Sequence, residues 1–153
     1  MRTGRSLISP GTTADELVAA LSRHRRREMV ILPVALSGNA PSGAWIPTDD
    51  RDYLLVPATA SPTRRRSILC HEVGHILLHH DPALHDGLTT DQMRSLAPNL
   101  PLDTTRRMLQ RTGYTDIEEA DAEHVGTALS AALEDVARAA EWESSSRLSS
   151  RLR

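Results

Sequence analysis

Apolar residues recur at helical spacing at two places in the first half of the chain. The first series follows Thr12 and Thr13, either of which can cap a helix, and it predicts about four helical turns. The second follows Ser61 or Thr63 and predicts a central helix that ends near Asp81. The apolar stripe of this central helix consists of Ile68, Leu69, Val73, Ile76 and Leu77.

Three short apolar runs lie between these two helices and predict strands. The run at 29–36 is interrupted by Pro33, which indicates an outer strand or a strand with a bulge. The runs at 45–46 and 53–56 are separated by turn-forming residues and have the character of a hairpin.

Helical patterns also follow the central helix. Short helices are expected at 91–96 and 104–110, the second ending at Gly113. An Ala-rich helix is expected from Asp116 to about Trp142. Residues 144–153 contain only Ser, Arg and Leu, so we predict one domain over 1–143 and a disordered tail over 144–153.

Composition narrows the class of protein. The chain has 153 residues, of which 39% are hydrophobic and 25% charged, as expected for a globular domain. No apolar run approaches the roughly 20 residues that span a bilayer, so we expect no membrane partner. The single cysteine excludes an intramolecular disulfide, and the N-terminal residues lack a signal-peptide pattern. We therefore expect a cytoplasmic protein.

The charge of the chain argues against a nucleic-acid-binding protein. Its formal net charge is -2, which removes the electrostatic attraction that non-specific binding to nucleic acid requires. Arginines cluster at 23–27 and 64–66, but no aromatic residues interleave with them. The clusters are therefore expected to be solvated helix ends, and a DNA-binding regulator is the least favoured reading.

The central helix carries the sequence His71-Glu72-Val73-Gly74-His75, an H-E-x-x-H pattern. Residues four apart lie about 40° apart on a helix, so His71 and His75 can offer imidazole nitrogens to one ion. Glu72 points about a quarter turn away, from where it can act as a general base on a water without binding the metal. The pattern therefore predicts a catalytic zinc site with Glu72 as its base.

Two histidines leave such a site incomplete, because catalytic zinc sites generally use three protein ligands. The acidic start of the last helix supplies the candidates for the third ligand. Glu119 and Glu123 share one face of that helix, so one could bind the metal while the other orients a histidine. The candidates are Glu118, Glu119, Asp121, Glu123 and His124.

The motif and its surroundings resemble the ImmA/IrrE-type metallopeptidases, which are small gluzincin-like proteins. Residues 67–80, SILCHEVGHILLHH, are similar to the family segment H-E-x-G-H-x-L-L-x-H. Residues 119–130 are similar to a second segment, E-x-E-A-D/E-x-F-A-x-x-L-L. Val125, Gly126 and Ser130 depart from that second pattern, where an aromatic residue, alanine and leucine are usual. The strand-like runs at 43–46 and 50–56 also look like strands of this family.

The resemblance implies a fold, a ligand set and a reaction. The fold is an α+β zincin-like minidomain, in which a small mixed or antiparallel sheet accompanies the metal helix and a glutamate-bearing helix. Glu119 becomes the third Zn²⁺ ligand and Glu123 a carboxylate behind a histidine, with Glu118 as the rival to Glu119. The implied reaction is hydrolysis of peptide bonds in a protein partner, such as a helix-turn-helix repressor encoded nearby.

A binding module is the alternative to an enzyme. In that interpretation the chain is a catalytically silent, metal-stabilised domain of a phage or toxin-antitoxin-like gene pair, which sequesters its partner without cutting it. The presence of Glu72 favours the enzyme.

Other reactive residues near the motif have simpler interpretations. Cys70 is expected to be a small buried residue rather than a thiolate ligand. Histidines at the end of the central helix are expected to complement the helix dipole, and among them His79 lies one further turn beyond the motif. Tyr114 and His124 are candidate donors to an oxyanion. The histidines at the helix end are His79, His80 and His85.

Overall fold

The computed structural model describes residues 6–9, 11–34, 43–47, 50–80, 83–84 and 111–151. Its elements combine a mixed sheet with long helices, so the predicted α+β class is confirmed. In chain order they are α2 (Ala14–Arg25), β1 (Glu28–Val34), β2 (Ala44–Pro47), β3 (Arg51–Pro57), α3 (Pro62–Leu77), β4 (Ala83–Leu84), β5 (Arg111–Gly113) and α6 (Asp116–Arg151).

Helices α2 and α3 begin at caps that the sequence predicted. Thr13 caps α2 and forms a capping box with Glu16, in which each side chain accepts a hydrogen bond from the other residue's backbone N–H. Ser61 caps α3 by accepting a hydrogen bond from the backbone N–H of Arg64, and Pro62 occupies the first helical position. The first turn of each helix is therefore stabilised by its own local sequence.

The three-stranded sheet has the order β1-β3-β2. Strand β1 runs parallel to β3, whereas β2 runs antiparallel to β3, as the predicted hairpin requires. Pro33 lies in β1, which is an edge strand, so the proline's missing N–H interrupts no hydrogen bonding on the outer side. The prediction of an outer strand at this proline is confirmed.

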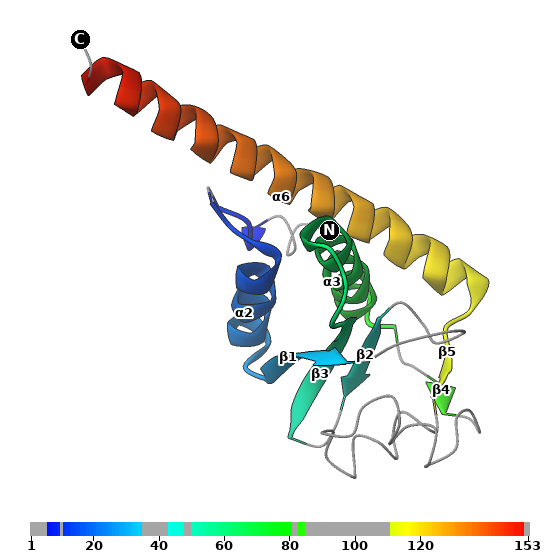
Figure 1. Cartoon of the computed structure of the whole chain (residues 1–153). Coiled ribbons are helices and arrows are strands. Elements are labelled where there is room, and N and C mark those ends of the chain that lie inside the picture. The colour runs from blue at the N-terminus through cyan, green and yellow to red at the C-terminus, as the bar shows by residue number, and fades with distance from the viewer. Residues whose placement is uncertain are drawn as a thin grey trace.

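The central helix α3 is covered on both sides. Leu54 and Val56 of β3 pack with Trp45 of β2 on the helix side of the sheet, in one core cluster with residues of α2, α3 and α6. Helix α6 crosses α3 on the side away from the sheet (Figure 1). Its buried residues recur at helical spacing and form the face toward α3. They are Ala122, Val125, Gly126, Leu129 and Leu133.

Helix α6 is longer than the sequence predicted. It continues through residues 144–151, for which we expected a disordered tail, and its C-terminal end extends beyond the other described elements (Figure 1). Neither glycine nor proline occurs after Gly126, and extending an existing helix costs far less than nucleating one. Ion pairs at i, i+4 spacing, Glu134–Arg138 and Glu143–Arg147, support the exposed part. The proposed domain boundary at 143 stays a prediction.

The antiparallel pair of β4 and β5 was not predicted, because it joins segments that are far apart in the sequence. The short helices expected at 91–96 and 104–110 lie outside the described residues, as does His85.

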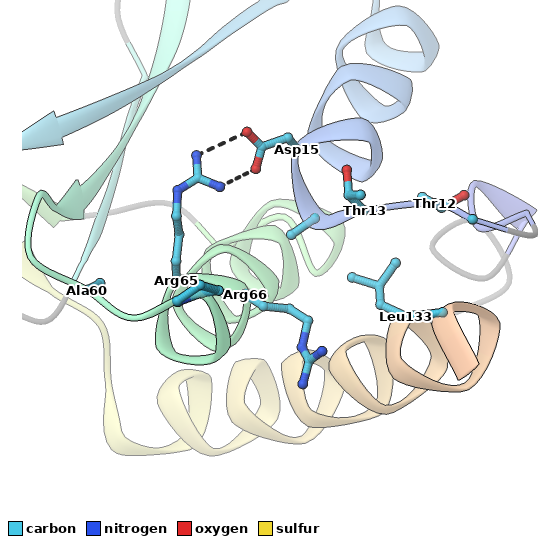
Figure 2. Close-up of a pocket in the computed structure, with 11 residues that line it drawn as sticks. Thr12, Thr13, Asp15, Ala60, Arg65, Arg66 and Leu133 are labelled. Atoms are coloured by element: carbon cyan, nitrogen blue, oxygen red, sulfur yellow. Dashed lines mark hydrogen bonds and ion pairs between the residues drawn. The ribbon is translucent and has the colours of Figure 1, made fainter. Parts of the chain in front are cut away.

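The arginine clusters form ion pairs within the protein and are not simply solvated helix ends. Asp52 is fully buried, and its carboxylate accepts hydrogen bonds from Arg25 Nη1 at 2.7 Å and Arg27 Nε at 2.6 Å. In the second cluster, Arg65 pairs with Asp15 of α2 (Figure 2). These arginines hold α2 against the sheet and against α3, which accounts for their positions without a nucleic acid.

Candidate metal centre

His71 and His75 lie one turn apart on α3, with their rings in an edge-on arrangement and the ring centroids 4.7 Å apart. Their Nε2 atoms are 3.1 Å from one another. His75 is almost completely buried, whereas about a quarter of the His71 side chain is exposed. The two Nε2 atoms therefore lie close together near the surface, with His71 on the solvent side and His75 on the buried side.

Glu119, in the first turns of α6, completes this group. Its Oε2 atom lies 3.1 Å from His71 Nε2 and 3.6 Å from His75 Nε2. Two ligands of a tetrahedral zinc ion, each bound at about 2.0 to 2.2 Å, are separated by roughly 3.3 to 3.6 Å. Potential ligand atoms of the three residues all lie within 4.8 Å of one another. The three separations of 3.1, 3.1 and 3.6 Å lie close to this range, and two imidazole nitrogens with one carboxylate oxygen are a donor set that suits a metal ion such as zinc.

Glu123 lies one turn further along α6, behind His71. Its Oε2 atom is 3.2 Å from His71 Nδ1. A carboxylate in this position accepts a hydrogen bond from the N–H at Nδ1, so the proton stays on Nδ1. The lone pair of Nε2 is then directed at the donor group formed by His71, His75 and Glu119. The positions of Glu119 and Glu123 beside His71 agree with those that the resemblance implied, and their roles at a metal ion stay predictions.

The side chain of Glu118 forms hydrogen bonds with Thr115, at the start of α6. Its carboxylate accepts hydrogen bonds from the backbone N–H and hydroxyl of Thr115, while its own N–H donates to Thr115 Oγ1. These contacts form a capping box at the start of α6. The backbone hydrogen bond from Thr115 is the main cause that lowers the pKa of Glu118, and the hydrogen bond from the Thr115 hydroxyl contributes. Glu118, the alternative candidate for the third ligand, thus stabilises the first turn of the helix that carries Glu119.

The remaining candidates on α6 face elsewhere. Asp121 and His124 are exposed. His124 is rotated by about 100° from Glu123, away from the face that meets α3. The structure does not bring His124 to the donor group, so its suggested role as an oxyanion donor receives no geometric support.

Close contact between α3 and α6 brings the carboxylates of α6 within reach of the histidines of α3. A Cβ atom at Gly74 would lie 2.7 Å from the carbonyl oxygen of Ala122, and one at Gly126 would lie 2.8 Å from the Cα of His71. Because both contacts are with backbone atoms, a side chain at either glycine would force the helices apart. The two glycines therefore set the separation across which Glu119 and Glu123 reach His71.

Glu72 is buried, with 5% of its surface exposed, and its carboxylate lies near the start of β2. A Cβ atom at Gly43, the residue before β2, would come within 3.7 Å of Glu72 Oε1. The glutamate of the motif is thus on the sheet side of α3, beside the start of the edge strand β2.

Cys70 precedes the first histidine but faces the core. It is fully buried, and burial raises the pKa of its thiol to about 12. A protonated thiol in this position is a packing residue, as the sequence predicted.

Two further residues lie beside His75: Tyr114, which the sequence suggested as an oxyanion donor, and His80, which it assigned only to the helix dipole. The ring of Tyr114 stacks on that of His75, with centroids 3.6 Å apart and planes inclined by 13°. His80 Nδ1 lies 2.9 Å from His75 Nδ1. His79, which the helical spacing favoured, is exposed and has a positive φ of 56°. The spacing argument failed because α3 ends at Leu77, before either of these histidines.

A pocket of about 360 Å³ lies at the opposite, N-terminal end of α3. It is lined by the first turns of α2 and α3 and by Leu133 and Ala137 of α6, and it opens to solvent. Figure 2 shows Arg65 reaching Asp15 beside it, and Arg66 pairs with Glu134 of α6. None of the residues that line this pocket belongs to the donor group.

None of the described helices is long and apolar enough to cross a membrane. Comparison with curated proteins and with solved structures returned no match. Comparison with protein families matched residues 26–120 to the IrrE N-terminal-like domain, Peptidase M78. The match includes β1 to α3 and the start of α6, and so contains His71, His75 and Glu119. Since it extends over more than half of the chain, the protein belongs to this family of metallopeptidase-like domains.

Proposed function

We propose that the protein is a zinc-dependent metallo-endopeptidase, in which His71, His75 and Glu119 hold the ion. The convergence of two imidazole nitrogens and one carboxylate oxygen within 4.8 Å carries this proposal. The donors come from two helices, and two of them are the histidines of the H-E-x-x-H motif that includes Glu72. Family membership supports a peptidase-like domain, and the donor set extends that support to zinc.

Zinc would supply Lewis acidity, which makes a water nucleophilic near neutral pH and polarises a carbonyl group. Glu72 accepts the proton of the attacking water and passes it to the nitrogen of the leaving amine. Glu123 keeps a proton on His71 Nδ1, so that Nε2 remains a donor to the ion. Each of these residues thus acts on a proton at a defined atom.

The substrate we propose is a protein partner, such as a helix-turn-helix regulator. About half of the Glu119 side chain is exposed, so the donor group is open to solvent on that side. This exposure supports a large substrate such as another protein. A carbonyl group on a flexible segment of another protein can therefore approach from solvent. This partner follows from the family resemblance and is part of the proposal.

Glu72→Gln tests the reaction and separates an enzyme from a binding module. The variant keeps the shape of the side chain but cannot accept the water's proton. With equal zinc content, we expect the wild-type chain to cleave a co-expressed candidate regulator and the variant to leave it intact, as measured by mass spectrometry of the partner. Cleavage at the wild-type rate by the variant would overturn Glu72 as the base. Partner binding without cleavage by either form would favour the module.

A further inference from the structure

His75, the buried histidine of the donor group, is contacted by His80 at the ring nitrogen that faces away from the other donors. His75 Nε2 faces His71 and Glu119, while its Nδ1 lies 2.9 Å from Nδ1 of His80. Tyr114 stacks on the face of the His75 ring. The ring of His75 is therefore held in its plane by Tyr114 and contacted at both nitrogens.

His80 reaches this position through the way α3 ends. His79 adopts the left-handed conformation, its N–H donates to the carbonyl of Ile76 at 3.1 Å, and the N–H of His80 donates to the carbonyl of His75 at 3.0 Å. This pair of bonds is a Schellman motif, which turns the chain back over the last helical turn. The motif usually brings an apolar residue onto that turn, but here it brings an imidazole onto His75.

Two Nδ1 atoms 2.9 Å apart form a hydrogen bond only when one of them carries a proton and the other accepts it. If His75 Nδ1 carries the proton, its Nε2 lone pair is directed at the donor group formed with His71 and Glu119. His80 must then accept through Nδ1 and keep its own proton on Nε2. The opposite assignment would leave His75 Nε2 protonated and unable to bind a metal.

We propose that His80 is a positioning residue for the metal centre, which fixes His75 in the tautomer with its proton on Nδ1. This inference rests on the proposed zinc site. It gives each histidine of the motif its own acceptor from a separate element: Glu123 of α6 behind His71, and His80 of the helix terminus behind His75. The first acceptor is a carboxylate and the second an imidazole.

The test compares zinc affinity in variants of similar shape at position 80. In His80→Asn the side-chain oxygen stands about where Nδ1 of histidine stands, whereas His80→Leu has a similar shape and no acceptor. We expect His80→Leu to bind zinc about 10 to 100-fold more weakly than wild type, in competition with a chelator, and His80→Asn to recover most of that loss. His79→Gly, which suits the left-handed position next to it, should bind zinc as wild type does.

A second measurement reads the tautomer directly and needs no variant. In the zinc-loaded wild-type protein, long-range ¹H–¹⁵N correlation spectra of the histidine rings should show His75 protonated on Nδ1. Equal zinc affinity in His80→Leu and wild type, failure of His80→Asn to bind better than His80→Leu, or a proton on His75 Nε2 would each overturn the role of His80. A wild-type chain that binds no zinc would instead overturn the proposed function.

Discussion

Gly126 of α6 packs directly against the backbone of His71: a Cβ atom at position 126 would lie 2.8 Å from the His71 Cα. The family segment that residues 119–130 resemble has alanine at this position, so the departure falls at one of the two close contacts between the helices. Because Glu119 and Glu123 lie on the same face of α6, a change in helix separation moves both carboxylates relative to His71.

Gly126→Ala should therefore weaken the metal centre. Alanine favours a helix over glycine by about 1 kcal/mol, but the contact with the His71 backbone is an overpacking that costs about 1 to 3 kcal/mol. We expect at least a roughly tenfold loss of zinc affinity, comparable to the loss of a residue that hydrogen-bonds to a metal ligand. Ser144→Ala, in the exposed part of α6, is the control and should bind zinc normally. Wild-type affinity in Gly126→Ala would show that helix separation does not limit the site.

The glutamates at the start of α6 should differ in their effects on zinc. Glu119→Ala removes a ligand and should abolish tight binding. Glu123→Ala removes the acceptor behind His71 and should cost about 10 to 100-fold in affinity, whereas Glu118→Ala should cost little. Isothermal titration of zinc into the three variants gives the order. If Glu118→Ala had the lowest zinc affinity of the three variants, the assignment of Glu119 as the ligand would be wrong.

Glu118 should instead contribute to stability in a pH-dependent way. Its pKa is lowered in the folded protein, chiefly by the hydrogen bond from the Thr115 backbone N–H. The stabilisation is therefore complete above the unfolded pKa of about 4.3 and disappears as the pH falls through the lower folded value. Glu118→Ala should lower the thermal midpoint of the metal-free protein by a few degrees at pH 7. A difference between wild type and variant that grows as the pH falls below 4 would contradict the capping box.

Asp52 should be among the residues whose loss most reduces the free energy of unfolding. Asp52→Ala leaves Arg25 and Arg27 without their buried acceptor and should cost about 3 kcal/mol, the low end for a broken buried pair, because both arginines keep some exposure. Asp50→Ala, which removes an exposed partner of Arg51, should cost less than about 1 kcal/mol. Urea unfolding of the two variants measures the contrast, and equal losses would contradict it.

The parts of the fold that could be predicted depend on local sequence. The caps at Thr13 and Ser61 and the apolar stripe of α3 are local features that require no knowledge of the rest of the chain. The same periodicity placed Glu119 and Glu123 on one face of α6. The grouping of His71, His75 and Glu119 follows from two such helices once they pack, and its function as a zinc site stays a prediction.

What could not be predicted depends on distant contacts or on an unusual backbone conformation. The pairing of Arg25 and Arg27 with Asp52 spans about a sixth of the chain and leaves no periodic signal. The position of His80 requires a non-glycine residue, His79, in the left-handed conformation, which sequence patterns rarely indicate. Helix α6 exceeded its expected end because weak helix formers without a breaker can extend an established helix.

The separation of His71 and Glu119 by 48 residues also bears on how the protein folds. The two histidines can come together as soon as α3 forms, because they are one turn apart on the same helix. Glu119 can join them only after α6 has docked, which is a slow, long-range step in the sense of contact order. Metal uptake by the nascent chain would therefore begin on a helix that offers two nitrogens, and capture would tighten when the carboxylate arrives. An ion bound in this way would cross-link the two helices, so its removal would take away a link between segments that the chain brings together late.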